Sequence, residues 1–231
     1  MSKYKHLLFD LDHTLWDYEQ NVRESLSEIF LLHKINSLGN VNFEKFFEAF
    51  KEVNNLLWHQ FNLGKIDRGE LRAERFIRIF NLVKLPLEAI PESMEDDFII
   101  RTSSKPGVIP DAFEVLKYLN ERYAMHIITN GFNESQFHKL NHSGLIEYFD
   151  LVVTSENSGF RKPDKRIFQH ALVKLKTSPS ECLMIGDNPH SDILGAKNAN
   201  IDQVHYNPSA VKYGIKPTHT IQNLKALMDF L

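Results

Sequence analysis

The chain has 231 residues, of which 42% are hydrophobic and 25% are charged, as in an ordinary soluble globular protein. Its formal net charge of −3 argues against a nucleic acid polymer or an anionic membrane as partner. The apolar run before Asp10 is too short for a signal-peptide core or a membrane span, and no other run is long enough to span a bilayer. A single cysteine, Cys182, fits a reducing compartment. We therefore expect a cytoplasmic protein.

The first half of the chain predicts one strand and then a helical block. Residues 4–10 form a short apolar run that is typical of a buried strand. From 16 to 103 apolar residues recur at helical spacing, and no convincing strand pattern is present. Within this block Asp67 and Glu70 have the spacing of a capping box, which predicts a helix that starts at Asp67 and ends before Pro86.

After about residue 104, strand and helix patterns alternate. We expect strands at 125–129, 151–154, 182–185 and 203–206, and helices at about 109–122, 164–176, 190–198 and from 223. A further helix is expected to be capped by Asn133 and to end at Gly144. This alternation predicts an α/β fold, with a Rossmann-like parallel sheet covered by helices on both faces. Residues 1–15 and 104–231 then form the core, and 16–103 form an inserted helical domain.

Polar side chains follow the carboxyl ends of the predicted strands, where open α/β sheets bind their ligands. They should converge on one cleft and comprise Asp10, Asp12, Thr129, Asn130, Lys162, Asp187 and Asp192. Clustered carboxylates repel each other unless a cation lies among them, and an all-oxygen set suits Mg²⁺. Zinc is disfavoured, because no thiolate is available there and the histidines lack ligand spacing.

The remaining side chains fit phosphoryl transfer. Thr129, Asn130 and Lys162 can hold the non-reacting oxygens of a phosphoryl group. A free carboxylate can act as the nucleophile, and a second one two residues away lies on the same side of an extended chain. With Asp10 kept ionised by Mg²⁺ and Lys162, we expect Asp12 to be free to carry a proton part of the time.

The order DxDxT, TN, KP and GDxxxxD resembles the haloacid dehalogenase superfamily of aspartyl-phosphate phosphatases. The four motifs lie at Asp10 to Thr14, Thr129-Asn130, Lys162-Pro163 and Gly186 to Asp192. The resemblance implies that the helical insertion is a type-I cap, that Asp10 is the nucleophile and that Asp12 is the acid/base. It also implies Mg²⁺ held by Asp10, Asp187 and the backbone carbonyl of Asp12, with Asp192 as a further ligand or a neighbouring carboxylate. Many members carry glycine where this chain carries His13.

Two further features bear on the substrate. Relatives that cleave carbon–halogen bonds generally lack the second aspartate, so Asp12 favours phosphoryl chemistry. Residues 53–66 and 127–132 resemble the YjjG-type pyrimidine 5′-nucleotidases, which implies a nucleoside monophosphate substrate. Candidate contacts to its base or sugar are Asn54, Trp58, His59 and Phe61, although aromatics at helical spacing fit a cap core equally well.

Other functions stay open. A sugar-phosphate phosphatase or a phosphomutase would use the same core motifs, because a fold does not determine a substrate. A non-catalytic binding protein is the remaining alternative, and the intact set of Asp10, Asp12, Lys162 and Asp187 argues against it. We expect a small-molecule phosphomonoester as the partner, and a monomer or a homodimer.

Overall fold

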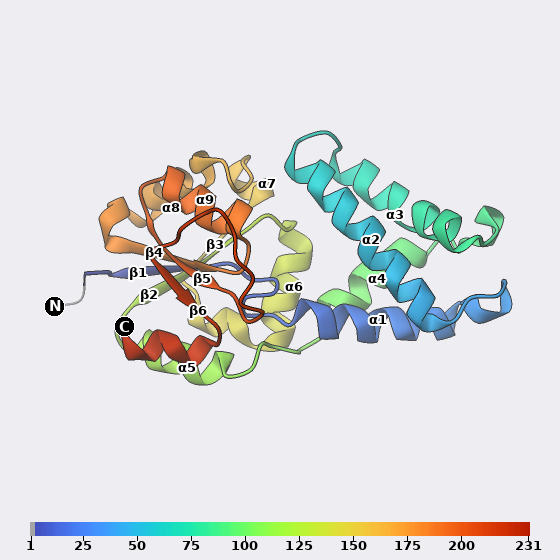
Figure 1. The fold of residues 1–231 in the computed structure, drawn as a ribbon, viewed down its shortest axis with the longest axis horizontal. Helices are drawn as coiled ribbons and strands as arrows, with labels where there is room; N and C mark the ends of the chain where they lie inside the picture. Colours follow the sequence, from blue (N-terminus) through green and yellow to red (C-terminus); the bar gives the residue numbers. More distant parts are fainter. Residues whose placement is uncertain (1–2) are drawn as a thin grey trace. The chain divides into compact units, whose positions relative to one another are not determined.

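The computed structural model describes residues 3–231. The chain divides into two compact units. One comprises the residues up to Tyr18 together with Pro106–Leu231, and the other is Glu19–Lys105 (Figure 1). None of the helices in the described residues is long and apolar enough to cross a membrane.

The first unit is built on a six-stranded parallel sheet. In the order β3-β2-β1-β4-β5-β6, β1 lies at the centre of the sheet. The strands are β1 (His6–Phe9), β2 (Ala124–Thr129), β3 (Leu151–Thr154), β4 (Cys182–Gly186), β5 (Asp202–Tyr206) and β6 (His219–Ile221). The predicted α/β fold is therefore confirmed, and β6 is a strand that the sequence pattern did not indicate.

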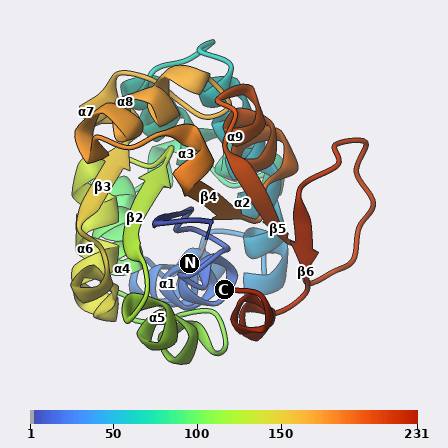
Figure 2. The ribbon, with the colours of Figure 1, turned by 90° about the vertical axis from the view of Figure 1, so that its left-hand side faces the viewer.

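Helices cover both faces of this sheet, and the alternation of side chains along β1 shows why. Leu7 and Phe9 belong to a core cluster with residues of α5, whereas Leu8 belongs to a second cluster with residues of α8. Figure 2 shows α8 and α9 on one side of the sheet and α5 on the other. The helices of this unit are α5 (Ala112–Asn120), α6 (Asn133–Ser143), α7 (Ser155–Ser158), α8 (Lys165–Leu175) and α9 (Leu194–Asn198).

Short helical turns complete the first unit, and two of its predicted helices differ from expectation, one in type and one in its cap. The turns are η3 (Leu145–Tyr148), η4 (Pro179–Glu181), η5 (Pro189–Ile193) and η6 (Leu224–Asp229). The closing helix is thus a 3₁₀ segment, capped by Asn223. Asn133 does not cap α6, because it is the first helical residue and its side-chain oxygen accepts a hydrogen bond from Thr154 Oγ1 at 2.5 Å. The predicted end at Gly144 is confirmed, with a φ of 77°.

The second unit is helical, and no strand interrupts residues 19–105, all of which the structure describes. Its helices are α1 (Tyr18–Leu32), α2 (Phe43–Asn62), α3 (Arg68–Val83) and α4 (Met94–Ser103), with short 3₁₀ turns η1 (Ile35–Ser37) and η2 (Leu87–Ala89). The capping box is confirmed: Asp67 accepts from the Glu70 N–H, and the Glu70 side chain accepts from the Asp67 N–H.

The chain leaves the first unit and re-enters it along adjacent segments. Trp16 pairs with Val108 in an antiparallel bridge, and the Asp17 N–H donates to the Gly107 carbonyl at 3.1 Å. The two ends of the helical insertion therefore start from neighbouring points of the core.

Candidate active site

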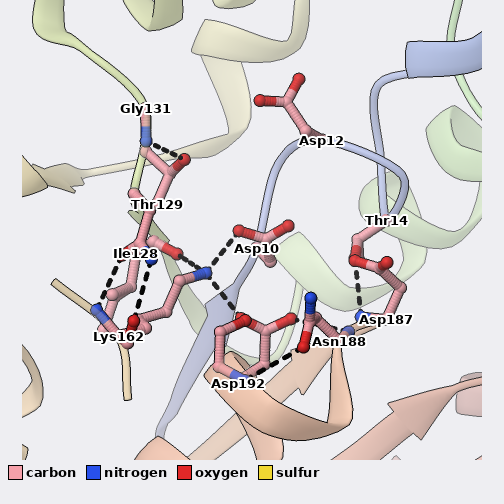
Figure 3. Close-up of polar contacts among 12 residues, drawn as sticks. Asp10, Asp12, Thr14, Ile128, Thr129, Gly131, Lys162, Asp187, Asn188 and Asp192 are labelled. Atoms are coloured by element: carbon pink, nitrogen blue, oxygen red, sulfur yellow. Dashed lines mark hydrogen bonds and ion pairs between the residues drawn. The ribbon is translucent and has the colours of Figure 1, made fainter. Parts of the chain in front are cut away.

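Three carboxylates meet where β1 and β4 end. The Asp10 N–H continues the ladder of β1 by donating to the Ile185 carbonyl at 2.9 Å, which brings Asp10 beside the end of β4. Asp10, Asp187 and Asp192 each offer a carboxylate oxygen within 4.8 Å of the others (Figure 3). The parallel register thus assembles a cluster whose members are far apart in sequence.

Lys162 is the cation of this cluster, and its ammonium has three partners. Nζ lies 2.5 Å from Asp10 Oδ1 and 2.7 Å from Asp192 Oδ1, and it donates to the Ile128 carbonyl at 2.7 Å. The side chain is buried. An ammonium has three donors, so all of its hydrogen-bonding capacity is directed at these atoms.

Asn130 supports Lys162 rather than facing the cluster with its side-chain amide. Its Nδ2 donates to the Lys162 carbonyl at 2.9 Å, and its Oδ1 accepts from the Lys162 N–H at 2.7 Å. The sequence predicted an amide donor to a phosphoryl oxygen and gave no sign of these hydrogen bonds to the backbone of Lys162. Thr129 is buried beside it, and its Oγ1 accepts from the Gly131 N–H at 3.1 Å, which leaves the hydroxyl hydrogen to donate.

Asp192 is held on every side. Its carboxylate accepts from the Asn188 N–H and from Ser191 Oγ, each at 3.0 Å, besides its contact with Lys162. A Cβ at Gly186 would lie 2.4 Å from the Asp192 carboxylate, so only glycine leaves room for this side chain. Asp192 is therefore built into the cluster and is not merely a residue near the start of a helix.

Asp187 is fixed by Thr14 and His205. Thr14 Oγ1 donates to Asp187 Oδ1 and accepts from the Asp187 N–H, both at 3.1 Å. His205 Nε2 lies 2.9 Å from the Asp187 carbonyl oxygen. His205 is a supporting residue that the sequence analysis did not single out; it lies near the end of β5, next to β4.

The charges of this cluster are unbalanced. Burial raises the pKa of Asp10 to about 7, although Lys162 opposes the shift, and Asp192 adds to it. Burial, followed by the charges of Asp192 and Asp10, raises the pKa of Asp187 well above its usual range. One ammonium does not balance the repulsion among three crowded carboxylates, and a hard divalent cation would reduce it. The donor atoms are all oxygen. The residues present therefore fit Mg²⁺.

Asp12 lies apart from this cluster, as Figure 3 shows. Lys139 Nζ lies 2.6 Å from its Oδ1, and Gln136 Nε2 donates to its Oδ2 at 3.0 Å. Burial alone would raise the pKa of Asp12, but the charge and hydrogen bonds of Lys139 and the hydrogen bond of Gln136 hold it below its usual range. That Asp12 carries a proton part of the time stays a prediction, and the structure pairs the ionised form of Asp12 with Lys139. The side chain of Asp12 is also not part of the acidic cluster.

The turn after β1 places His13 in a conformation that favours glycine. His13 has a φ of 64°, in the left-handed region that glycine adopts most readily. Its N–H donates to the Trp16 carbonyl at 3.0 Å, which closes the turn. The imidazole ring lies 4.5 Å from the ring of Tyr18, measured between centroids.

The substrate-contact candidates all lie on α2, in the helical unit. Asn54 and Phe61 are buried, and the Phe61 ring meets Trp58 edge to face at 5.4 Å. His59 is exposed, and its position along the helix places it on a different side from Trp58 and Phe61. The structure therefore brings Trp58 and Phe61 together and separates His59 from them.

Comparisons with known proteins agree with this geometry. A model of the haloacid dehalogenase-like hydrolase family matches residues 4–200. The chain is 32% identical to pyrimidine 5′-nucleotidase YjjG of Escherichia coli K12, covering 99% of this chain and 98% of the relative. It is 30% identical to pyrimidine 5′-nucleotidase PynA of Streptococcus pneumoniae R6, covering 99% and 95%. The crystal structure of the HAD-hydrolase YfnB of Bacillus subtilis bound to magnesium superposes with a TM-score of 0.87 at 28% identity, covering 99% and 98%.

Proposed function

The chain belongs to the haloacid dehalogenase-like hydrolases, and we propose that it is a Mg²⁺-dependent phosphatase of nucleoside 5′-monophosphates. One observation carries the proposal. Two carboxylates that follow the same strand have different surroundings: Asp10 lies against Lys162 and two other carboxylates, whereas Asp12 lies against Lys139 and Gln136. Two aspartates with separate environments suit two separate roles, a nucleophile and a proton shuttle.

The proposed reaction has two steps. An oxygen of Asp10 attacks the phosphorus, the bond from phosphorus to the leaving oxygen breaks, and Asp12 gives that oxygen a proton. Water then attacks the aspartyl-phosphate, and Asp12 accepts the proton that this water loses. Lys162 balances charge on Asp10, while Thr129 is positioned to donate to a phosphoryl oxygen. The Asp12 in this structure, paired with Lys139, corresponds to the ionised form that the second step requires.

Asp10, Asp187 and the backbone carbonyl of Asp12 would hold the Mg²⁺. Asp192 would serve as a further ligand or as a carboxylate that holds Lys162 beside Asp10. When bound, the cation supplies positive charge for the phosphoryl oxygens and for the crowded carboxylates. The magnesium bound to the YfnB hydrolase supports this assignment.

The nucleotide preference rests on the helical unit and on the relatives. Both the YjjG and the PynA relatives are pyrimidine 5′-nucleotidases, and each aligns with almost the whole of this chain. We assign residues 16–103 to a helical cap domain that is inserted in the sequence of the α/β core of 1–15 and 104–231. In it Trp58 would stack on a base, with Asn54, His59 and Phe61 as further candidate contacts. Such an enzyme would work in the cytoplasm, as a monomer or a homodimer.

The test is a hydrolysis panel that includes dUMP, UMP, dTMP, sugar phosphates and p-nitrophenyl phosphate, with Mg²⁺. We expect the pyrimidine nucleotides to give the highest kcat/KM among the natural phosphates. Asp10→Asn should reduce kcat on the order of 1,000-fold or more, because the amide cannot act as nucleophile. Chelation with EDTA should abolish turnover, and added Mg²⁺ should restore it. Asp150→Asn, which changes an exposed carboxyl, is the matched control and should keep full activity.

A sugar-phosphate phosphatase or phosphomutase is the second candidate, because the core residues in the proposed scheme would contact only the phosphoryl group. Sugar phosphates hydrolysed far faster than every nucleotide would favour the phosphatase, and an isomerised product that retains its phosphate would favour the mutase. A wild-type protein that is inert with Mg²⁺ toward the entire panel would contradict the phosphatase assignment.

A further inference from the structure

Helix α6 directs two polar side chains toward the core of its own unit. Gln136 is 2% exposed and Lys139 is 6% exposed, and they are one turn apart on the same side of the helix. Each of them contacts a different oxygen of the Asp12 carboxylate, Lys139 at Oδ1 and Gln136 at Oδ2. Because both oxygens are held, the plane of the carboxylate is fixed and not only its position.

The Lys139 ammonium is confined by aromatic rings as well as by Asp12. Nζ lies 4.3 Å from the centroid of the Trp16 ring and 5.7 Å from that of Tyr18. Trp16 is fully buried, and its backbone bridges to Asp12. A lysine with a buried stem, a carboxylate partner and two ring faces nearby has little freedom to swing away.

Gly131 makes the arrangement possible for Gln136. A Cβ at this position would lie 1.8 Å from Gln136 Nε2 and 2.5 Å from Gln136 Cδ. The backbone at Gly131 is not left-handed, so the glycine is needed here for space and not for conformation. The side chain of Gln136 thus occupies the space that the Cβ of any other residue at position 131 would fill.

We propose that Lys139 and Gln136 are positioning residues that orient the Asp12 carboxylate for proton exchange with the leaving oxygen. The proposal rests on the proposed function, because it assigns the two side chains to the proton shuttle of that reaction. Neither residue touches the phosphoryl group in this scheme, since both act through Asp12. Their importance therefore depends on how much the leaving group needs a proton.

Because of that dependence, a positioning role should change the ratio of the rates on two substrates that differ in how much the leaving group needs a proton. A purely structural role would not change that ratio. A ribose alkoxide is a strong base and leaves only with a proton, whereas p-nitrophenolate leaves without one. Lys139→Met keeps a long apolar stem against Trp16 and removes the donor. We expect its kcat/KM to fall about 30-fold or more on the best nucleotide of the panel and less than about 3-fold on p-nitrophenyl phosphate. Both rates come from one preparation, so their ratio does not depend on the folded fraction.

Three further variants complete the experiment. Lys139→Arg retains a cationic donor and should recover most of the lost ratio. Gln136→Leu, which leaves Lys139 in place, should change the ratio in the same direction by a smaller factor, and it serves as the second test where Lys139→Met folds poorly. His138→Ala alters the exposed neighbour on α6 and should leave both rates unchanged.

The outcomes distinguish a failure of the positioning role from a failure of the proposed function. Equal losses on both substrates in Lys139→Met and in Gln136→Leu, or no loss on either, would overturn the positioning role while the phosphatase stands. A wild-type protein with no activity on either substrate would instead overturn the proposed function itself.

Discussion

At the scale of single residues, an unusual pair lies far from the acidic cluster. His6, opposite Ala124, begins the pairing of β1 with β2, and His126 lies opposite Leu8; His126 Nε2 lies 3.0 Å from His6 Nδ1. His126 is buried, and its Nδ1 has no hydrogen-bond partner among the described residues. Burial, with a smaller contribution from His6, lowers the pKa of His126 to about 4.

This pair should make stability depend on pH. A histidine whose pKa is lower in the folded state than the usual 6.5 stabilises the fold above pH 6.5, and this stabilisation is lost as the pH falls toward 4. We expect the free energy of unfolding to be about 1–2 kcal/mol lower at pH 5 than at pH 8 on account of His126, allowing for partial solvent screening. Urea titrations of wild type and His126→Leu at both pH values measure the effect.

His126→Leu should weaken this pH dependence, since leucine does not titrate. The exposed His142→Ala is the control and should keep the wild-type dependence. An identical pH dependence in wild type and His126→Leu would contradict the role given to His126.

The carboxylates of the site could be predicted from sequence because they are local signals. Asp10 and Asp12 directly follow an apolar run, and Asp187 follows another. The partners of these groups could not be predicted in the same way. Lys139 meets Asp12 across 127 positions of the chain, and only the packing of α6 determines which of its side chains faces inward. The signal available was weak: two polar residues, Gln136 and Lys139, at helical spacing beside Leu140.

At the scale of elements, the capping box at the start of α3 should make a measurable contribution to the free energy of unfolding. Asp67 accepts from the Glu70 N–H at 2.8 Å, and Glu70 returns the bond to the Asp67 N–H at 2.9 Å. Asp67→Ala leaves the Glu70 N–H without its side-chain acceptor, while the Glu70 side chain can still accept from the N–H of residue 67. We expect a loss of about 1 kcal/mol in the free energy of unfolding, measured by urea titration.

Asp67→Asn is the matched comparison, since asparagine is as good an N-cap as aspartate and should retain most of the stability. A loss in Asp67→Asn as large as that in Asp67→Ala would show that the negative charge matters and not the cap. Activity toward p-nitrophenyl phosphate should stay unchanged in both variants, because α3 carries no residue of the acidic cluster.

Elements with strong local signals were predictable, and those that depend on distant partners were not. The capping box and the glycine end of α6 are each read from a few neighbouring residues. By contrast, β6 has only three residues, and it exists because Val204 to Tyr206 of β5 provide hydrogen-bonding partners for it. Asn133 has the composition of a cap, yet its side chain is engaged by Thr154 at the end of β3. In both cases a contact distant in sequence outweighed the local preference.

At the scale of the whole molecule, the helical insertion should be separable from the core. Two hydrophobic clusters, which pack against the two faces of the sheet, use residues of 4–18 and 106–231 alone. Because the Asp17 N–H donates to the Gly107 carbonyl, we expect a linker of roughly four residues to be long enough to replace residues 19–105. We expect the shortened protein to fold cooperatively and to retain hydrolysis of p-nitrophenyl phosphate with Mg²⁺.

The shortened protein should also lose its preference among natural phosphates, because the candidate base contacts on α2 are removed. Circular dichroism with thermal unfolding tests the fold, and the same substrate panel tests the preference. The full chain, assayed in parallel, is the reference. A core that unfolds, or one that keeps the nucleotide preference of the full chain, would contradict the proposal that the sheet unit performs hydrolysis and the helical unit determines the preference.

The strand order also has a consequence for biosynthesis. β1 leaves the ribosome before the other strands of this sheet, yet its neighbours are β2 and β4, which begin at residues 124 and 182. The helical residues 19–105 have mostly local contacts and can fold as they emerge, while the strand that precedes the nucleophile must wait for most of the chain. Asp10 is thus synthesised well before the residues that would make it reactive, such as Lys162, Asp187 and Asp192.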